Sequence, residues 1–284
     1  MTHNNVPSAI KKPLLTFLGW MVLVVMASVM IIPFLWMIST SLKPQMFLTE
    51  FPPRFITPDM NFSAYRTLFS LLPMARMLLN SVLVTLFVTI GQIGAASTAG
   101  YAFARIPFKG SNILLVIFLG VFMVPTQVIL TPLFILTRNF GWLNTYQGVI
   151  FPLMAMRISF GLFLLKQYFH GIPIALEESA FLDGAHHGII FLKIVLPLVK
   201  PALATMLVLT VMDSWNTLLW PLLVARDTEM MTLTVGLSSL RGRYTTEWNL
   251  VMAGAVISVL PIIMTFITAQ KQFIEGMTRT GLKG

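Results

Sequence analysis

Two charged side chains stand inside long apolar segments of the sequence. Arg157 lies near the middle of the apolar run 147–166, and Asp213 lies near the middle of the run 201–224. An ionisable group in such a setting is costly and usually has a function. We expect these residues either to line a polar pathway or to pair, with each other or with a partner chain, as a structural contact. The sequence leaves both possibilities open.

Neutral polar residues accompany the two charges. Ser214, Trp215 and Asn216 come directly after the acidic one, and Gln127 follows Pro125 in another apolar run. Hydrogen-bonding groups beside an aromatic face are a common way of holding sugars. The proline also frees backbone groups that a wet cavity can satisfy. Because the same side chains can instead link neighbouring helices, ligand binding and helix packing both remain open for them.

A third polar feature is the stretch EESAFLDGAHHGIIFLKIVLPLVKP, which begins at Glu177 and interrupts the apolar chain. It has the signals of a short helix. Glu177 and Glu178 stand near the start, where the helix dipole favours anions, and Gly184 can end the helix. A second short helix over about 186–195 is expected to stop at Pro197. Two short helices on a membrane face would form a docking surface.

The histidines do not suggest a metal site. His186 and His187 are adjacent, so their side chains point to different faces of a helix, and no third ligand lies nearby in the sequence. Asp183 is more simply explained as an acceptor of backbone amides at the junction of the two short helices. The absence of Cys excludes thiolate metal sites and disulfides. No metal is therefore predicted.

The composition indicates whether the chain folds in water or in a membrane. Of its 284 residues, 56% are hydrophobic and only 10% are charged, whereas soluble domains carry about 25% charged residues. The mean hydropathy is +0.83. The chain therefore has too few polar residues to cover a water-soluble surface and is predicted to be an integral membrane protein. Its net charge of +9 comes from scattered basic residues, a pattern that argues against nucleic-acid binding.

Six apolar runs are long enough to cross a membrane as helices. They cover residues 14–38, 77–103, 111–135, 147–166, 201–224 and 249–269. Basic residues weakly favour an orientation with both termini in the cytoplasm, which places the loop 167–200 and the tail 270–284 there. The first run lacks a cleavage site and is too long for a signal segment, so we expect it to be retained. The prediction is one all-α transmembrane domain over residues 1–284.

The polar loop resembles a motif of a known transporter family, the EAA loop in permease subunits of bacterial ATP-binding-cassette importers. The matching positions are Glu178, Ser179, Ala180, Gly184, Ile194, Leu196 and Pro197. A serine replaces the first alanine, which is a small-for-small change. The segments LLNSVLVT, AGYAFARIPFKG and WNTLLWPLL resemble the carbohydrate branch of that family, the maltose-type, binding-protein-dependent permeases. The resemblance covers most of the chain.

In that family the loop seats in a cleft of an ATP-binding subunit, so the resemblance implies an ATPase-coupling surface here. Its residues would be Glu177, Glu178, Ser179, Ala180, Asp183, Gly184 and Ala185. Small side chains would let the helix sink into the cleft, and Glu178 or Glu177 would offer a carboxylate to a basic partner residue. ATP and magnesium would be bound by the partner subunits, and this chain would hold no cofactor.

The resemblance also implies the remaining partners. These are a second homologous permease subunit, two ATP-binding subunits and an extracytoplasmic solute-binding protein, besides membrane lipid. The loop 238–246 would contact the binding protein, and the tail 276–284 would reach between the ATP-binding subunits. The implied protein is a multi-pass permease of the bacterial cytoplasmic membrane that imports a carbohydrate or related polar solute by alternating access.

Other functions fit the residues less well. A polytopic membrane enzyme needs a catalytic set at one depth, yet the four histidines lie outside the predicted spans: His3, His170, His186 and His187. A secondary transporter typically has repeated halves, and no internal repeat is evident. An importer of an anionic solute, such as a sugar acid or glycerol phosphate, stays open, because an unpaired Arg157 lining the pathway would favour it.

Overall fold

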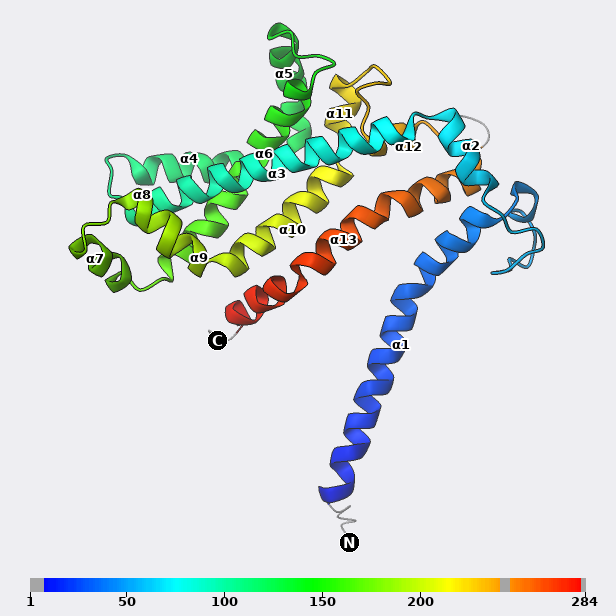
Figure 1. Ribbon diagram of the computed structural model, residues 1–284, viewed down its shortest axis with the longest axis horizontal. Helices are drawn as coiled ribbons and strands as arrows, with labels where there is room; N and C mark the ends of the chain where they lie inside the picture. The colour runs from blue at the N-terminus through cyan, green and yellow to red at the C-terminus, as the bar shows by residue number, and fades with distance from the viewer. Residues whose placement is uncertain (1–7, 241–245, 282–284) are drawn as a thin grey trace. The chain divides into compact units, whose positions relative to one another are not determined.

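The computed structural model describes residues 8–240 and 246–281, and it describes side chains for 16–240 and 246–271. Within these ranges the chain forms helices joined by loops, and no strand occurs (Figure 1). The predicted all-α fold is confirmed. Residues 241–245, in the loop predicted to contact a binding protein, and the side chains of the predicted tail 276–284 lie outside the described residues.

Four predicted spans correspond to single long helices. These are α1 (Ser8–Leu42), α3 (Met74–Arg105), α6 (Tyr146–His170) and α13 (Trp248–Gly281). The fifth predicted span is α10 (Lys200–Asn216) continued by α11 (Leu219–Val224), and it is long and apolar enough to cross a membrane as one segment. The helices extend beyond the apolar runs that predicted them, by one residue for α10 with α11 and by thirteen for α13.

The third predicted span is divided in two. It consists of α4 (Ser111–Met123) and α5 (Thr126–Asn139), whose axes are bent by 101° at the break. Val124, between them, has φ −74° and ψ 123°. This extended conformation follows from Pro125, since a residue before proline is disfavoured in the helical region and proline lacks an N–H for the helix ladder. Pro132 lies inside α5 without ending it.

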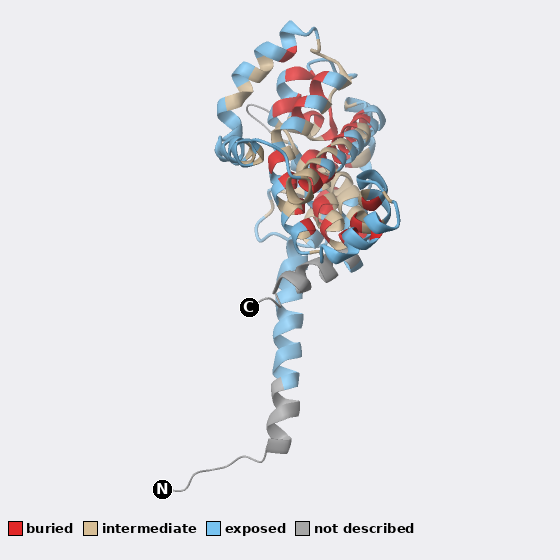
Figure 2. Ribbon diagram, turned by 90° about the vertical axis from the view of Figure 1, so that its left-hand side faces the viewer, coloured by how far each residue is buried: buried red, intermediate tan, exposed pale blue. Residues whose placement is uncertain are grey.

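The first compact unit, residues 1–71 with 240–257, contains α1, a 3-10 turn (Gln45–Phe47), α2 (Ser63–Leu71) and the beginning of α13. Its polar contacts follow the end of α1. The Ser41 hydroxyl lies 2.9 Å from that of Tyr65, and the Lys43 ammonium lies 4.3 Å from the centre of the Trp36 ring. Most of α1 is exposed apolar surface, drawn pale blue in Figure 2, as expected for a helix that meets lipid or another subunit.

The second compact unit, residues 72–239 with 258–284, is built around the packed helices α3 and α6, here called the α3–α6 pair. Small residues let these helices approach closely. A Cβ atom on Gly91 of α3 would lie 2.1 Å from the sulfur of Met154 in α6, and one on Gly161 of α6 would lie 2.9 Å from the Cβ of Ala96 in α3. The buried residues of Figure 2 concentrate in such packed helices.

Short helices complete the second unit. They are α7 (Ala175–Leu182), α8 (His187–Ile190), α9 (Leu196–Leu198) and α12 (Leu233–Ser238), with a π-helical turn (Phe191–Val195) between α8 and α9. In Figure 1, α7 and α8 lie near the C-terminal end of α3, and α11 and α12 lie toward its N-terminal end. The α3–α6 pair therefore has a distinct set of short elements at each end.

Candidate functional site

The loop singled out by the sequence folds around α7. Glu177 and Glu178 lie in the first turn of this helix, as predicted, where its dipole stabilises their charges. Gly184 follows the helix with a φ of +84°, a left-handed conformation that glycine adopts without steric cost. Its N–H donates to Phe181 O at 3.0 Å, and the N–H of Ala185 donates to Ala180 O at 2.9 Å. The glycine thus closes α7 and turns the chain toward α8.

Glu177 points into the protein. Its side chain is only 4% exposed, and Oε1 lies 2.7 Å from Nε of Arg105, which is itself 8% exposed. The hydroxyl of Tyr101 donates to Oε2 at 3.0 Å. We call Tyr101, Arg105 and Glu177 the Glu177 cluster. It ties the first turn of α7 to the last turns of α3.

Arg105 also holds the end of α6. Its Nη2 donates to the backbone oxygen of Phe169 at 2.8 Å and to that of Ile172. Carbonyls at a helix C-terminus lack partners within the helix, and a cation there is favoured by the helix dipole. One buried guanidinium therefore joins α3, the end of α6 and α7.

Most other predicted coupling residues lie on the surface of the loop. Glu178, Ser179, Asp183 and Gly184 are exposed, Ala185 is partly exposed, and Ala180 is buried. Leu182, on the same helix, is 89% exposed.

The second half of the loop differs in detail from the prediction. Asp183 makes no side-chain cap, and the junction is capped by His186, whose Nδ1 accepts from the N–H of Gly188 at 3.2 Å. The helical segment does not stop at Pro197 but runs to Leu198. Pro197 lies in the first turn of the separate short helix α9, where its missing N–H is not needed. The buried side chains of Ile190 and Val195 join the core that contains Phe169, so this half anchors the loop.

The two charges inside the spans pair with each other. A terminal nitrogen of Arg157 in α6 lies 2.6 Å from Oδ1 of Asp213 in α10, and the side chains are 55% and 35% exposed. They border a small hollow that is also lined by Gln92 and Thr210. Both of the roles left open by the sequence are compatible with this position, since the residues pair and still reach the surface of the chain.

The neighbouring polar candidates do not gather around this pair. Trp215 is buried, and its indole N–H donates to Ser258 O of α13 at 3.0 Å, which is a helix-to-helix contact. Ser214 is buried beside it. Asn216 is exposed and donates to Met212 O of its own helix at 2.7 Å. Gln127 is exposed in the first turn of α5.

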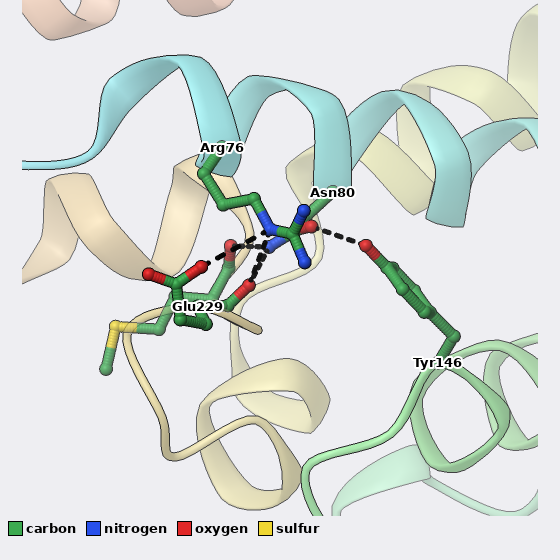
Figure 3. Close-up of polar contacts among 5 residues, drawn as sticks. Arg76, Asn80, Tyr146 and Glu229 are labelled. Carbon is green, nitrogen blue, oxygen red and sulfur yellow. Dashed lines mark hydrogen bonds and ion pairs between the residues drawn. The ribbon is translucent and has the colours of Figure 1, made fainter.

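A cluster that sequence reasoning missed lies toward the other end of the α3–α6 pair (Figure 3). The fully buried Asn80 of α3 donates to the backbone oxygens of Glu229 and Met231, at 2.8 and 2.9 Å. Its amide oxygen accepts from the hydroxyl of Tyr146 in α6 at 2.7 Å. Arg76 adds an exposed contact to Glu229 at 3.6 Å. We call Arg76, Asn80, Tyr146 and Glu229 the Asn80 cluster.

The described residues contain no group of three or more His, Cys, Asp or Glu side chains that could hold a metal ion. A hollow of about 390 Å³ lies between α3 and α6 and is lined mainly by apolar side chains, among them Phe87, Ile90 and Phe151. Such a lining suits a lipid or helix contact better than a polar solute.

Comparisons with known proteins give relatives over most of the chain. The arabinooligosaccharides transport system permease protein AraQ of Bacillus subtilis is 41% identical over 205 residues, 72% of each chain. The trehalose/maltose transport system permease protein MalG of Thermococcus litoralis is 31% identical over 274 residues, 92% of this chain and 94% of that one. The sn-glycerol-3-phosphate transport system permease protein UgpE of Shigella flexneri is 34% identical over 207 residues, 72% and 73% of the two chains.

A solved structure shares the fold. A chain of a bacterial ABC transporter involved in the import of the acidic polysaccharide alginate superposes with a TM-score of 0.78 and 23% identity, covering 95% of this chain and 100% of that one. The family model described as "binding-protein-dependent transport system inner membrane component" matches residues 92–279. The resemblance seen in the sequence is thus confirmed. The relatives of this chain are transport permeases, not enzymes. The chain belongs to this family and is a permease subunit of an ATP-binding-cassette importer.

Proposed function

We propose that this permease imports a neutral carbohydrate, such as an oligosaccharide, and not an anionic solute. The relatives alone do not decide, since their names include both arabinooligosaccharides and sn-glycerol-3-phosphate. The observation that carries the proposal is the ion pair between Arg157 and Asp213.

The pair belongs on a polar surface because of where it lies. Both residues are near the middle of membrane spans and remain partly exposed on the isolated chain. Hydrocarbon is a very unfavourable surrounding for charges at that depth, so the exposed side faces the pathway or the partner permease. Because Asp213 cancels the charge of Arg157, the surface formed by the pair has no net charge to attract an anion. Its hydrogen-bonding groups still suit hydroxyls.

The test uses the charge-balanced double variant Arg157→Gln/Asp213→Asn. If the solute is neutral, Arg157→Gln alone or Asp213→Asn alone leaves one uncompensated charge. We expect each to lower uptake at least about tenfold, which corresponds to a free-energy cost of about 1.4 kcal/mol. The double variant then recovers uptake to within about threefold of the unaltered chain. The solute is chosen as the one that stimulates ATP hydrolysis in the presence of the binding protein. Uptake of this solute is then measured for each variant. If the double variant fails as badly as Arg157→Gln alone, the arginine binds an anionic solute and the proposal is wrong.

The coupling part of the proposal assigns α7 to an ATP-binding subunit. Glu178 is offered to a basic residue of that subunit, and Ser179, Ala180, Gly184 and Ala185 keep the surface small enough to enter a cleft. The exposure of Glu178 and Leu182 supports this role. Glu177, buried against Arg105, contributes by holding the helix in place. ATP and magnesium belong to the partner subunits.

The complete importer that we propose contains a second homologous permease, two ATP-binding subunits and an extracytoplasmic solute-binding protein. It lies in the bacterial cytoplasmic membrane with both termini of this chain in the cytoplasm. This orientation places α7 on the side where ATP is available. It also places the loops around α12 outside, where a binding protein arrives.

A further inference from the structure

The segment between α11 and α12, residues 225–232, is fixed to the rest of its unit by several polar contacts; we call it the strap. The side-chain oxygen of Asn144, just before α6, accepts from the N–H groups of Arg226 and Asp227 at 2.6 and 3.1 Å. Ser81 of α3 accepts from the N–H of Leu233, directly after the strap, at 2.8 Å. The strap is therefore held by the loop before α6, and the start of α12 is held by α3.

Asn80 is the centre of this attachment. Its amide has two N–H donors and one oxygen, and all three are used: the donors by strap carbonyls, the oxygen by Tyr146. It is fully buried. Loss of its donor to Met231 O leaves that carbonyl without its hydrogen bond, whereas Glu229 O also accepts from Nε of Arg76 at 3.2 Å. In Figure 3 the asparagine lies between the strap and Tyr146, joining α3, α6 and the strap at one point.

The same two helices hold α7 at their other end. Tyr101 and Arg105 of α3 bind Glu177, and Arg105 also binds the carbonyls at the end of α6. From Asn80 to Arg105, α3 is an unbroken helix of about 38 Å at 1.5 Å per residue. Close packing of glycine against neighbouring side chains fixes α6 to it between the two clusters. One packed pair of helices therefore joins the strap to α7.

We propose that Asn80 is a positioning residue that transmits the docking of the solute-binding protein from the strap through the α3–α6 pair to the coupling helix α7. The inference rests on the proposed function, because it needs a binding protein on the strap side and an ATP-binding subunit on the other. It assigns to a buried amide a part in the stimulation of ATP hydrolysis.

The experiment compares ATP hydrolysis by the reconstituted complex with and without solute-loaded binding protein. Tyr146→Phe removes one hydrogen bond and keeps the ring, and Asn80→Asp removes both donors to the strap. The matched control is Ser97→Ala, since Ser97 is equally buried in α3 but donates only to Ile93 O within the helix, at 2.6 Å.

Basal hydrolysis should stay within about twofold in Tyr146→Phe and Ser97→Ala. Stimulation by the binding protein should fall about fivefold in Tyr146→Phe, as for the loss of one net hydrogen bond, and further in Asn80→Asp, while Ser97→Ala keeps it. Stimulation in Tyr146→Phe equal to that in Ser97→Ala would overturn the inference, even if Asn80→Asp fails to fold. If the unaltered complex shows no stimulation by a binding protein at all, the proposed function itself is wrong.

Discussion

At the residue scale, the adjacent acids Glu177 and Glu178 have different tasks. Glu177 is buried in an ion pair with Arg105 and accepts from Tyr101, whereas Glu178 is exposed. Removing one partner of a buried ion pair typically costs about 3–5 kcal/mol, because the remaining charge has no counter-ion. An exposed carboxylate without such contacts contributes little to folding.

We therefore expect Glu177→Ala to lower the thermal unfolding temperature of the purified chain, and Glu178→Ala to leave it unchanged. Glu178→Ala should instead weaken attachment of the ATP-binding subunits in co-purification. Thermal unfolding in detergent and pull-down of the complex measure the two effects separately. Equal unfolding temperatures for the two variants would contradict the assignment.

The sequence could not have separated these two acids. Both stand in the same helical turn, and the resemblance to the EAA loop names the second without saying where the first points. Burial of Glu177 depends on Arg105, which is distant in the sequence and belongs to another helix. The pairing of Arg157 with Asp213 was likewise only one of two open possibilities, since hydropathy places a charge in a span but not on a face.

At the element scale, the start of α6 depends on a glycine. Gly148 accepts the indole N–H of Trp220 on its carbonyl at 3.0 Å, and a Cβ there would lie 2.0 Å from the backbone oxygen of Trp142. A backbone atom cannot move aside as a flexible side chain does. The first turn of α6 and the loop before it are thus in contact without room for a methyl group.

Gly148→Ala should accordingly destabilise the protein by about 1–3 kcal/mol, as overpacking does. Gly94→Ala is the control, because a Cβ at that glycine of α3 meets nothing within 4 Å, and alanine favours a helix over glycine by up to about 1 kcal/mol. The thermal unfolding temperature should fall for the first variant and stay or rise for the second. A fall of equal size in both would show that helix packing at Gly148 is not the cause.

Hydropathy predicted the long elements well because burial in a membrane requires long apolar helices. It could not predict which prolines interrupt them. Pro152 and Pro261 lie inside α6 and α13, while Pro125 separates α4 from α5. Whether a proline interrupts a helix depends on whether neighbouring groups hydrogen-bond to the backbone groups that the proline frees. A single sequence does not contain that information.

At the scale of the whole molecule, the orientation in the membrane can be measured directly, since the chain has no Cys and any introduced thiol is unique. Leu182→Cys on α7 and Phe51→Cys after α1 place thiols at positions that are 89% and 92% exposed. A membrane-impermeant maleimide should label Phe51→Cys in intact spheroplasts. It should label Leu182→Cys only in inverted vesicles, taken from cells that make this chain without the ATP-binding subunits that would cover α7. The opposite pattern would reverse the topology and remove the coupling role of α7.

The bend between α4 and α5 has a consequence for what surrounds the chain. With 13 and 14 residues, each helix is about 20 Å long, too short to cross a hydrocarbon layer of about 30 Å alone. At the bend the N–H of Val124 donates to Val121 O at 3.2 Å, but the end of one helix and the start of the next leave further backbone groups without a partner in their own helix. Residues 121–128 are exposed on the isolated chain. Lipid tails cannot hydrogen-bond such groups. The elbow must therefore be shielded from the acyl chains, either by the adjoining subunit or by water.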